Sequence, residues 1–119
     1  MANILLVDDS RTSRKILRNI LEGAGHTIVD EATDGEQAIE KYIASKPDVI
    51  TLDITMPVMD GIEALKQIKL VDSEAKVVMV SASSQKDKLI EAVKYGAEDF
   101  IAKPFEPSQI VSVLGKLIS

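Results

Sequence analysis

Carboxylate side chains follow two short apolar segments of the 119-residue sequence. Asp8 and Asp9 come directly after residues 4–7, and Asp53 comes directly after residues 49–52. Two like charges about 4 Å apart repel by roughly 4 kcal/mol at an effective dielectric near 20, so three gathered acids need a cation or a shared proton. Carboxylate oxygens completed by water suit Mg2+. The pattern predicts a Mg2+ site at which Asp53 acts as a nucleophile on phosphorus.

Two further polar residues end later apolar segments. These residues are Ser81 and Lys103, and Pro104 follows the lysine. A serine hydroxyl can donate a hydrogen bond to an incoming phosphoryl oxygen, and a lysine ammonium can neutralise Asp53 at rest and hold that oxygen afterwards. Each residue alone is typical of an ordinary strand end. Base rates favour a trans Lys103–Pro104 bond, although tight functional turns make a cis bond a candidate.

The segments that carry these residues alternate with segments of helical period. Apolar runs predict five strands, at residues 4–7, 27–32, 48–53, 75–81 and 99–103. Apolar spacing predicts five helices with these inward faces: Ile16, Leu17, Ile20, Leu21; Ala38, Ile39, Tyr42, Ile43; Ile62, Leu65, Ile68; Leu89, Ile90, Val93; Ile110, Val113, Leu114, Leu117. The basic residues of the first helix are expected to face water: Arg11, Arg14, Lys15, Arg18.

Alternating strands and helices predict an α/β fold, with a doubly wound parallel sheet of the flavodoxin-like (βα)5 type. The first, third and fourth strands are continuous apolar runs and should be central. The second is interrupted by Asp30 and Glu31, and the fifth is short, so both should be edges. Right-handed crossovers then favour the strand order 2-1-3-4-5. In that order the acids lie where ligands bind, between strands one and three.

Composition limits the classes of function. The chain length suits one domain spanning residues 1–119. The net charge is -5, from 14 basic and 19 acidic residues, and without a basic block neither nucleic acid nor a membrane surface is an expected partner. The absence of cysteine excludes disulfides and thiolate metal sites, and the single His26, expected as a solvated turn residue, excludes a multi-histidine site.

Targeting and membrane segments are not apparent in the sequence. The first residues, Met1 to Asn3, carry no positive charge on a side chain, and the apolar run after them is too short for a signal peptide. No apolar stretch approaches the roughly 20 residues of a transmembrane helix. We therefore expect a soluble, cytoplasmic protein.

The chain resembles response-regulator receiver domains over essentially its whole length, and is most similar to stand-alone chemotaxis regulators of the CheY type. The segments that carry the resemblance are Val7-Asp8-Asp9, Leu52-Asp53-Ile54-Thr55-Met56-Pro57 with Asp60-Gly61, Ser81-Ala82, and Phe100-Ile101-Ala102-Lys103-Pro104-Phe105. Each segment alone is weakly specific. Their order and spacing together are highly specific.

The resemblance implies a role for each site residue. Asp53 would be the phosphoacceptor, with a sensor histidine kinase similar to CheA as the donor. Asp9, Asp53 and the backbone carbonyl of Thr55 would bind Mg2+ directly, and Asp8 would act mostly through water. The protein would promote its own phosphotransfer and autodephosphorylation, and would not turn over a separate substrate. Thr55 and Ser83 occupy positions that tune dephosphorylation in the family, and neither residue is acidic or amide-bearing.

The resemblance also implies how a signal would leave the domain. Ser81 and Phe100 would form a switch pair, in which the hydroxyl moves to the phosphoryl group and the ring turns inward. The bond between Lys103 and Pro104 would be cis. The face formed by the fourth helix, fifth strand and fifth helix would bind the target. A flagellar motor switch protein is the first expected target; a phosphatase, another phosphorelay protein or a separate enzyme stay open as partners.

Three other classes of function fit the sequence less well. A haloacid-dehalogenase-type phosphatase needs a second acid two positions after its nucleophile, where this chain has Thr55. A flavodoxin-like cofactor binder needs a hydroxyl- and glycine-rich loop after the first strand, where Asp8 and Asp9 would repel a phosphate. A pseudo-receiver would lack some of the site residues, and this chain has all five.

Overall fold

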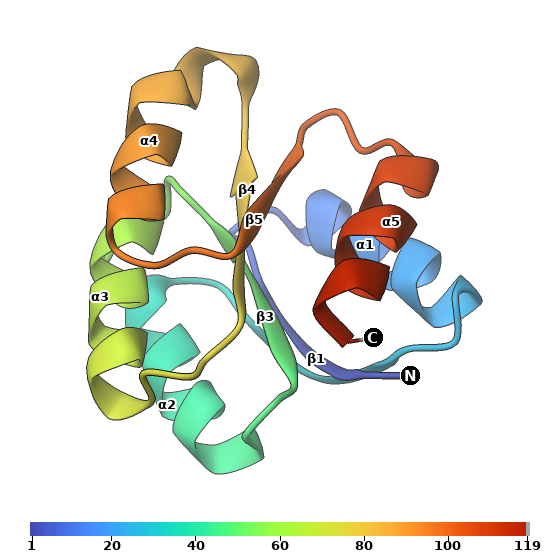
Figure 1. Ribbon diagram of the computed structural model, residues 1–119, viewed down its shortest axis with the longest axis horizontal. Helices are drawn as coiled ribbons and strands as arrows, with labels where there is room; N and C mark the ends of the chain where they lie inside the picture. The colour runs from blue at the N-terminus through green and yellow to red at the C-terminus, as the bar shows by residue number, and fades with distance from the viewer. Residues whose placement is uncertain (119) are drawn as a thin grey trace.

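Five parallel strands form the central sheet of the computed structural model, which describes residues 1–118 (Figure 1). They are β1 (Asn3–Val7), β2 (Thr27–Ala32), β3 (Val49–Asp53), β4 (Val77–Ser81) and β5 (Asp99–Ala102). The order β2-β1-β3-β4-β5 confirms the predicted flavodoxin-like sheet. Every residue of β3 and β4 is buried, as expected for central strands, whereas the two edge strands each have exposed residues.

Five α-helices connect and follow the strands in residues 1–118: α1 (Arg11–Gly23), α2 (Gly35–Ser45), α3 (Gly61–Val71), α4 (Lys86–Lys94) and α5 (Pro107–Ile118). A 3-10 turn, Ser83–Gln85, precedes α4. The side chains of Ser10, Asp34 and Asp60 each accept a hydrogen bond from a backbone N–H in the first turn of a helix, which explains where α1, α2 and α3 begin. Gly25 and Gly96 adopt φ of 94° and 98° after α1 and α4, which ends both helices.

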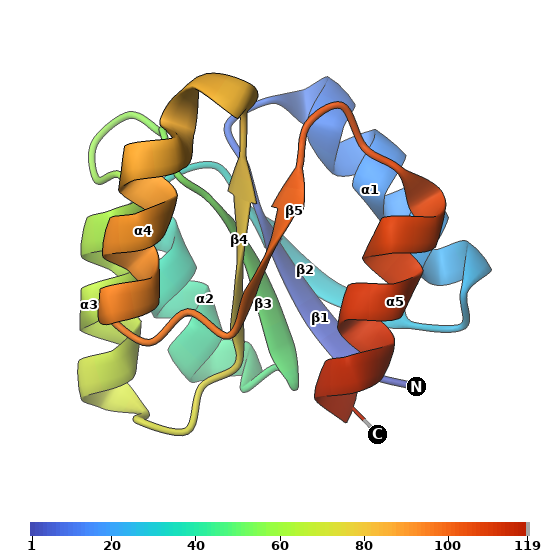
Figure 2. The same cartoon turned by 45° about the horizontal axis from the view of Figure 1, so that its top comes forward.

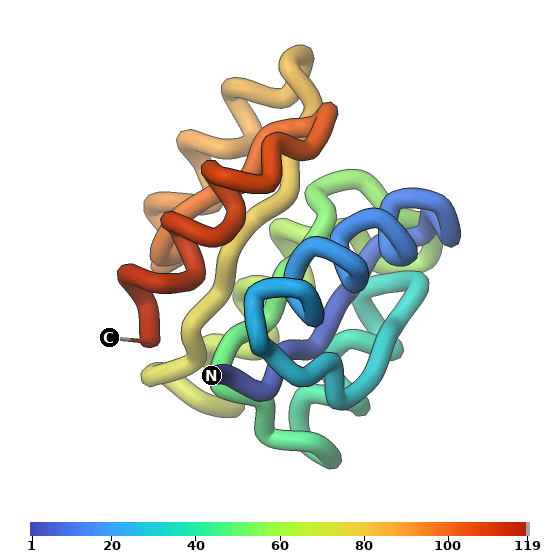
Figure 3. The backbone as a smooth tube through the Cα atoms, turned by 90° about the vertical axis from the view of Figure 1, so that its right-hand side faces the viewer, coloured from blue at the N-terminus to red at the C-terminus, as the bar shows by residue number. Residues whose placement is uncertain are grey.

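The helices cover both faces of the sheet. Helices α1 and α5 lie side by side on one face, onto which Figure 3 looks, and α2, α3 and α4 cover the other (Figures 1 and 2). Alternate residues of β1 enter the two cores: Leu6 packs with Leu17 and Leu114, and Leu5 packs with Leu65 on the opposite face. Burying one such side chain contributes roughly 1.5–3 kcal/mol, and these two layers hold the strand ends in place.

Four residues expected on inward helix faces are exposed instead. Ile16, Ile43, Ile90 and Val93 have exposed fractions of 45, 50, 57 and 62%. Each helix meets the sheet along a narrow stripe, so residues at the flanks of the stripe stay outside. In α4, which lies toward the narrow β5 edge, Ala92 is the fully buried residue. The apolar spacing was therefore right about the helices and wrong about these side chains.

The first residues are tied to the turn after α1. The backbone N–H of Ala2 donates a 3.1 Å hydrogen bond to Nδ1 of His26, which is half-buried. The prediction of a merely solvated histidine is therefore wrong. Within residues 1–118, every helix is too short or too polar to span a bilayer.

Candidate functional site

Three carboxylates converge at the carboxyl ends of β1 and β3. Asp8 and Asp9 follow β1, and Asp53 is the last residue of β3. The two strands are neighbours in the sheet, so their ends meet at one edge. One carboxylate oxygen from each acid lies within 4.8 Å of the other two. Asp8 and Asp53 are only 4 and 6% exposed, whereas Asp9 is open to solvent.

Lys103 faces the same acids from the end of β5. Its ammonium nitrogen lies 3.0 Å from Oδ2 of Asp8 and 3.7 Å from Oδ2 of Asp53. Its backbone N–H donates a 2.9 Å hydrogen bond to the carbonyl oxygen of Ser81, which ties β5 to β4 at this edge. The Lys103–Pro104 bond is cis, the isomer that the resemblance implies and that base rates disfavour. The lysine expected to point into this cleft does so.

Burial and like charge make Asp53 difficult to ionise without a cation. Its pKa is raised to about 6, first because it is buried and then because of the charge of Asp8; Lys103 lowers it and Asp9 raises it further. The site thus has three carboxylates whose negative charges repel one another, and one of them, that of Asp9, is accessible to water. That all-oxygen donor set fits Mg2+, which prefers a few carboxylates and keeps several waters.

Ser81 and Phe100 both line a cavity at the same end of the sheet. The cavity has a volume of about 290 Å3, and Leu89 and Lys103 also line it. Ser81 is 5% exposed, whereas Phe100 is 40% exposed. A second cavity, of about 280 Å3 near Tyr42, lies between the ends of α2 and α3 and has none of the predicted site residues in its wall.

Thr55 lies at the rim of the site, in the loop after β3. Its hydroxyl oxygen accepts a 2.6 Å hydrogen bond from Nε2 of Gln85, and Oε1 of Gln85 accepts one of 2.7 Å from the backbone N–H of Ala82. Gln85 was not among the predicted site residues. Because its partners are 30 and 3 residues away, a pattern in the sequence offered no sign of this contact.

Arg14 was placed on the wet face of α1, and this placement was wrong. Its side chain is only 14% exposed, and Nη1 donates a 2.6 Å hydrogen bond to the backbone carbonyl oxygen of Asp8. Its Nε contacts Glu31, one of the two acids that seemed only to interrupt β2. An acidic pair in a strand beside arginines at i and i+4 of a helix could have suggested the pairing.

The model of the response regulator receiver domain family matches residues 4–115. The chain belongs to this family. Among related receiver proteins, chemotaxis protein CheY of Thermotoga maritima is 48% identical over 96% of this chain and 95% of its own, and CheY of Bacillus subtilis is 45% identical over 98 and 97%. A solved CheX–CheY–BeF3–Mg complex from Borrelia burgdorferi contains a similar chain, with a TM-score of 0.91 and 38% identity over 98% of this chain and 90% of that one.

Proposed function

We propose that this receiver domain is the phosphoacceptor response regulator of a two-component system, phosphorylated on Asp53 by a histidine kinase. The observation that carries the proposal is the grouping of Asp8, Asp9 and Asp53 with Lys103 at 3.0–3.7 Å from two of them. Membership of the receiver family supports it. Residues 1–119 would form one such domain, a cytoplasmic signalling protein without turnover of a separate substrate.

The transfer joins an oxygen of Asp53 to the phosphorus of a phosphohistidine. An O–P bond forms as the P–N bond breaks, and the imidazole leaves with the electron pair of that bond and takes a proton from solvent. The product is an acyl phosphate on Asp53. Lys103, which contacts the carboxylates at rest, would hold a phosphoryl oxygen, and the hydroxyl of Ser81 would donate a hydrogen bond to another.

The metal-binding residues would be Asp9, Asp53 and the backbone carbonyl of Thr55, with Asp8 acting mostly through water. Mg2+ bound there would supply positive charge to neutralise the transferring group. Asp53 has most need of this positive charge, because burial and then the charge of Asp8 raise its pKa. The three acids would position the ion, and the ammonium of Lys103 adds a second positive charge beside Asp8 and Asp53.

The signal would leave through Ser81 and Phe100. Movement of the hydroxyl toward the phosphoryl group would open the 290 Å3 cavity on the Ser81 side, and the exposed ring of Phe100 would turn into it. The turn would change the surface made by α4, β5 and α5, where Ile90 and Val111 are exposed. That surface would bind the downstream target.

Chemotaxis is the pathway that the relatives favour. Two of them, at 45 and 48% identity over nearly the whole chain, are chemotaxis proteins. The kinase would then be similar to CheA, and the target a flagellar motor switch protein. The Borrelia complex, which holds CheY with CheX, BeF3 and Mg, supports binding of a further protein, such as a phosphatase. Nucleic acid and membranes are not proposed as partners.

Phosphorylation by acetyl phosphate tests the proposal directly. With Mg2+, intact-protein mass spectrometry should show one added phosphoryl group on the wild-type chain, and chelation of the metal should prevent the addition. Asp53→Asn should gain nothing, whereas Asp87→Asn, at an exposed acid of α4, should behave like the wild type. Equal labelling of Asp53→Asn would reject Asp53 as the acceptor. Capture of a motor switch protein should require BeF3 and Mg2+.

A further inference from the structure

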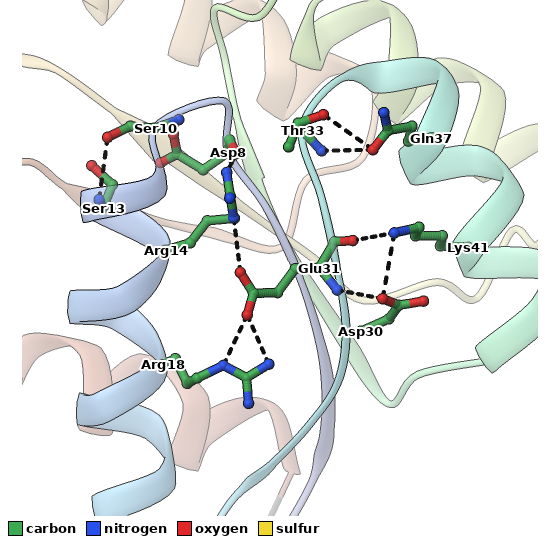
Figure 4. Close-up of polar contacts among 10 residues, drawn as sticks. All are labelled: Asp8, Ser10, Ser13, Arg14, Arg18, Asp30, Glu31, Thr33, Gln37 and Lys41. Carbon is green, nitrogen blue, oxygen red and sulfur yellow. Dashed lines mark hydrogen bonds and ion pairs between the residues drawn. The ribbon is translucent and has the colours of Figure 1, made fainter.

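Arg14 joins β2 to the acidic site. Its Nε donates a 2.8 Å hydrogen bond to Oε1 of Glu31, and its Nη1 donates one of 2.6 Å to the carbonyl oxygen of Asp8 (Figure 4). Arg18 binds the other oxygen of Glu31, with Nε at 2.9 Å and Nη2 at 2.7 Å. One carboxylate therefore holds two guanidinium groups, and only Arg14 reaches from there to Asp8.

A bulge in β2 places Glu31 on the α1 side of the sheet. Side chains three positions apart on a regular strand lie on opposite faces. Ile28, however, belongs to the core under α1 and α5, and Glu31 also contacts α1. The register with β1 passes from Ile28 directly to Asp30, so Val29 is an extra residue. This bulge turns Glu31 toward Arg14, the kind of re-aiming that bulges commonly produce.

The main chain of Asp8 is held from both sides. Its N–H donates a 3.0 Å hydrogen bond to the carbonyl oxygen of Ala32, at the end of β2, and its carbonyl oxygen accepts the bond from Arg14. That carbonyl belongs to the peptide that joins Asp8 to Asp9, so the guanidinium determines the orientation of the link between the two acids. Without Arg14, a polar group of a 4% exposed residue would lose this partner, which is unfavourable.

Geometry, more than charge, is what Arg14 contributes. Burial raises the pKa of Glu31, but the hydrogen bonds from Arg18 and Arg14 outweigh it and the pKa is lowered, so Glu31 stays ionised. Two carboxylates, Glu31 and Glu22, balance the two guanidinium groups of Arg14 and Arg18, so Arg14 brings little net charge to the site. A guanidinium presents several donors in a rigid plane, and this fork lets Arg14 contact Glu31 and the carbonyl of Asp8 together.

We propose that Arg14, held by Glu31, is a positioning residue that orients the Asp8–Asp9 peptide and thereby sets the affinity of the site for Mg2+. The inference rests on the proposed function, because the ion and Asp53 belong to it. Partners that orient metal-binding side chains typically change metal affinity by about 10- to 100-fold when they are removed. Loss of Arg14 is expected at the lower end of that range, since Asp9 and Asp53 themselves remain.

Direct titration with Mg2+ tests the proposal without relying on phosphorylation. Isothermal calorimetry would compare the wild type with Arg14→Ala, Arg14→Lys, Glu31→Gln and Arg18→Ala. We expect about tenfold weaker binding in both Arg14 variants, an intermediate loss in Glu31→Gln, and less than twofold change in Arg18→Ala. Arg18→Ala is the matched control because it also removes a partner of Glu31 but leaves the contact with Asp8.

Different results would count against the positioning role of Arg14 and against the proposed Mg2+ site. Urea unfolding and amide spectra would show which variants are folded. If Arg14→Ala does not fold, Arg14→Lys tests the proposal in its place. Wild-type affinity in Arg14→Lys would mean that charge is sufficient and would overturn the positioning role, as would equal losses in the Arg14 and Arg18 variants. If the wild type itself binds no Mg2+, the proposed site and the inference fail together. If it binds Mg2+ and accepts phosphate on Asp53 while Arg14→Ala binds equally well, only the inference fails.

Discussion

Gln85 binds Thr55 across the mouth of the site. The 2.6 Å hydrogen bond from Nε2 of Gln85 to the hydroxyl oxygen of Thr55 connects the 3-10 turn after β4 with the loop after β3. The same amide accepts a hydrogen bond from the backbone N–H of Ala82, the residue after Ser81. One side chain thus holds together the two loops between which a phosphoryl group would enter.

Replacing Gln85 with leucine should loosen the loop after β4. The backbone N–H of Ala82 would lose its partner, and a hydrogen bond of about 1 kcal/mol corresponds to roughly fivefold faster exchange of that amide with solvent. Amide exchange measured by NMR checks this value. Gln67→Leu, which removes a hydrogen bond between Gln67 and Glu63 within α3, should leave the Ala82 amide unchanged. Unchanged exchange in Gln85→Leu would show that the contact does not restrain the loop.

Gly61 has no room for a side chain. A β carbon there would overlap the carbonyl oxygen of Asp53, and this neighbour is backbone that cannot rotate away. Gly61→Ala should therefore displace the main chain of Asp53 and destabilise the protein by about 1–3 kcal/mol or more, since overpacking usually costs that much. Urea unfolding gives the free energy, and loss of phosphorylation would accompany it.

The matched control for that change is Gly115→Ala. Gly115 lies within α5, and a β carbon there meets no atom within 4 Å. Because alanine favours the helix over glycine by about 1 kcal/mol, this variant should be more stable than the wild type. Equal effects at the two positions would contradict the close packing of Gly61 on Asp53.

The pH dependence of stability should reveal the buried carboxyl of Asp53. In metal-free protein its pKa is raised to about 6, from 3.8. The folded state therefore holds this proton more tightly than the unfolded state does, so the favourable contribution is complete below pH 3.8 and is lost as pH rises through about 6. At pH 7.5, Asp53→Asn should be more stable than wild type by roughly 2 kcal/mol, less than the roughly 3 kcal/mol of the full shift because Lys103 loses a charged neighbour.

Urea unfolding with a chelator, from pH 4 to 8, would measure this difference. The gap between wild type and Asp53→Asn should shrink as pH falls toward 4 and also when Mg2+ is added at pH 7.5. A difference in stability that does not change with pH would mean that burial and the charge of Asp8 do not raise the pKa of Asp53.

His26 should make the attachment of the first residues sensitive to acid. Burial, followed by the charge of the N-terminus, lowers its pKa below 6.5. The unfolded state then binds the proton more readily, so the contribution of His26 is present above pH 6.5 and is lost as pH falls through its folded pKa. Protonation of Nδ1 also removes the acceptor for the N–H of Ala2. In an Asp53→Asn background, where Asp53 no longer titrates, the protection of the Ala2 and Thr27 amides against exchange, corrected for intrinsic rates, should fall on acidification.

His26→Gln is the control for that experiment, because glutamine does not take up a proton. Its exchange at Thr27, corrected for intrinsic rates, should vary less between pH 7.5 and 5.5 than in the parent. The same acid-induced loosening in both proteins would assign the effect to another group.

Much of the site was predictable because its residues mark strand ends. A run of apolar residues ended by a polar one is a local pattern, and parallel strands bring their carboxyl ends to one edge whatever lies between them. Asp8, Asp9, Asp53 and Lys103 were therefore expected together, and the structure brings them together. The order of the strands followed in the same way from which runs were continuous.

What surrounds those residues depended on tertiary structure. The bulge at Val29 decides on which face Glu31 lies, and it arises from the register between β1 and β2, which the sequence of β2 alone does not contain. Arg14 looked like a solvated helix residue until the packing of α1 beside β2 gave it two partners. The order of the elements and the residues at their ends could be predicted because they follow from local periodicity. The side chains that support the site could not, because contacts between distant segments depend on register and packing.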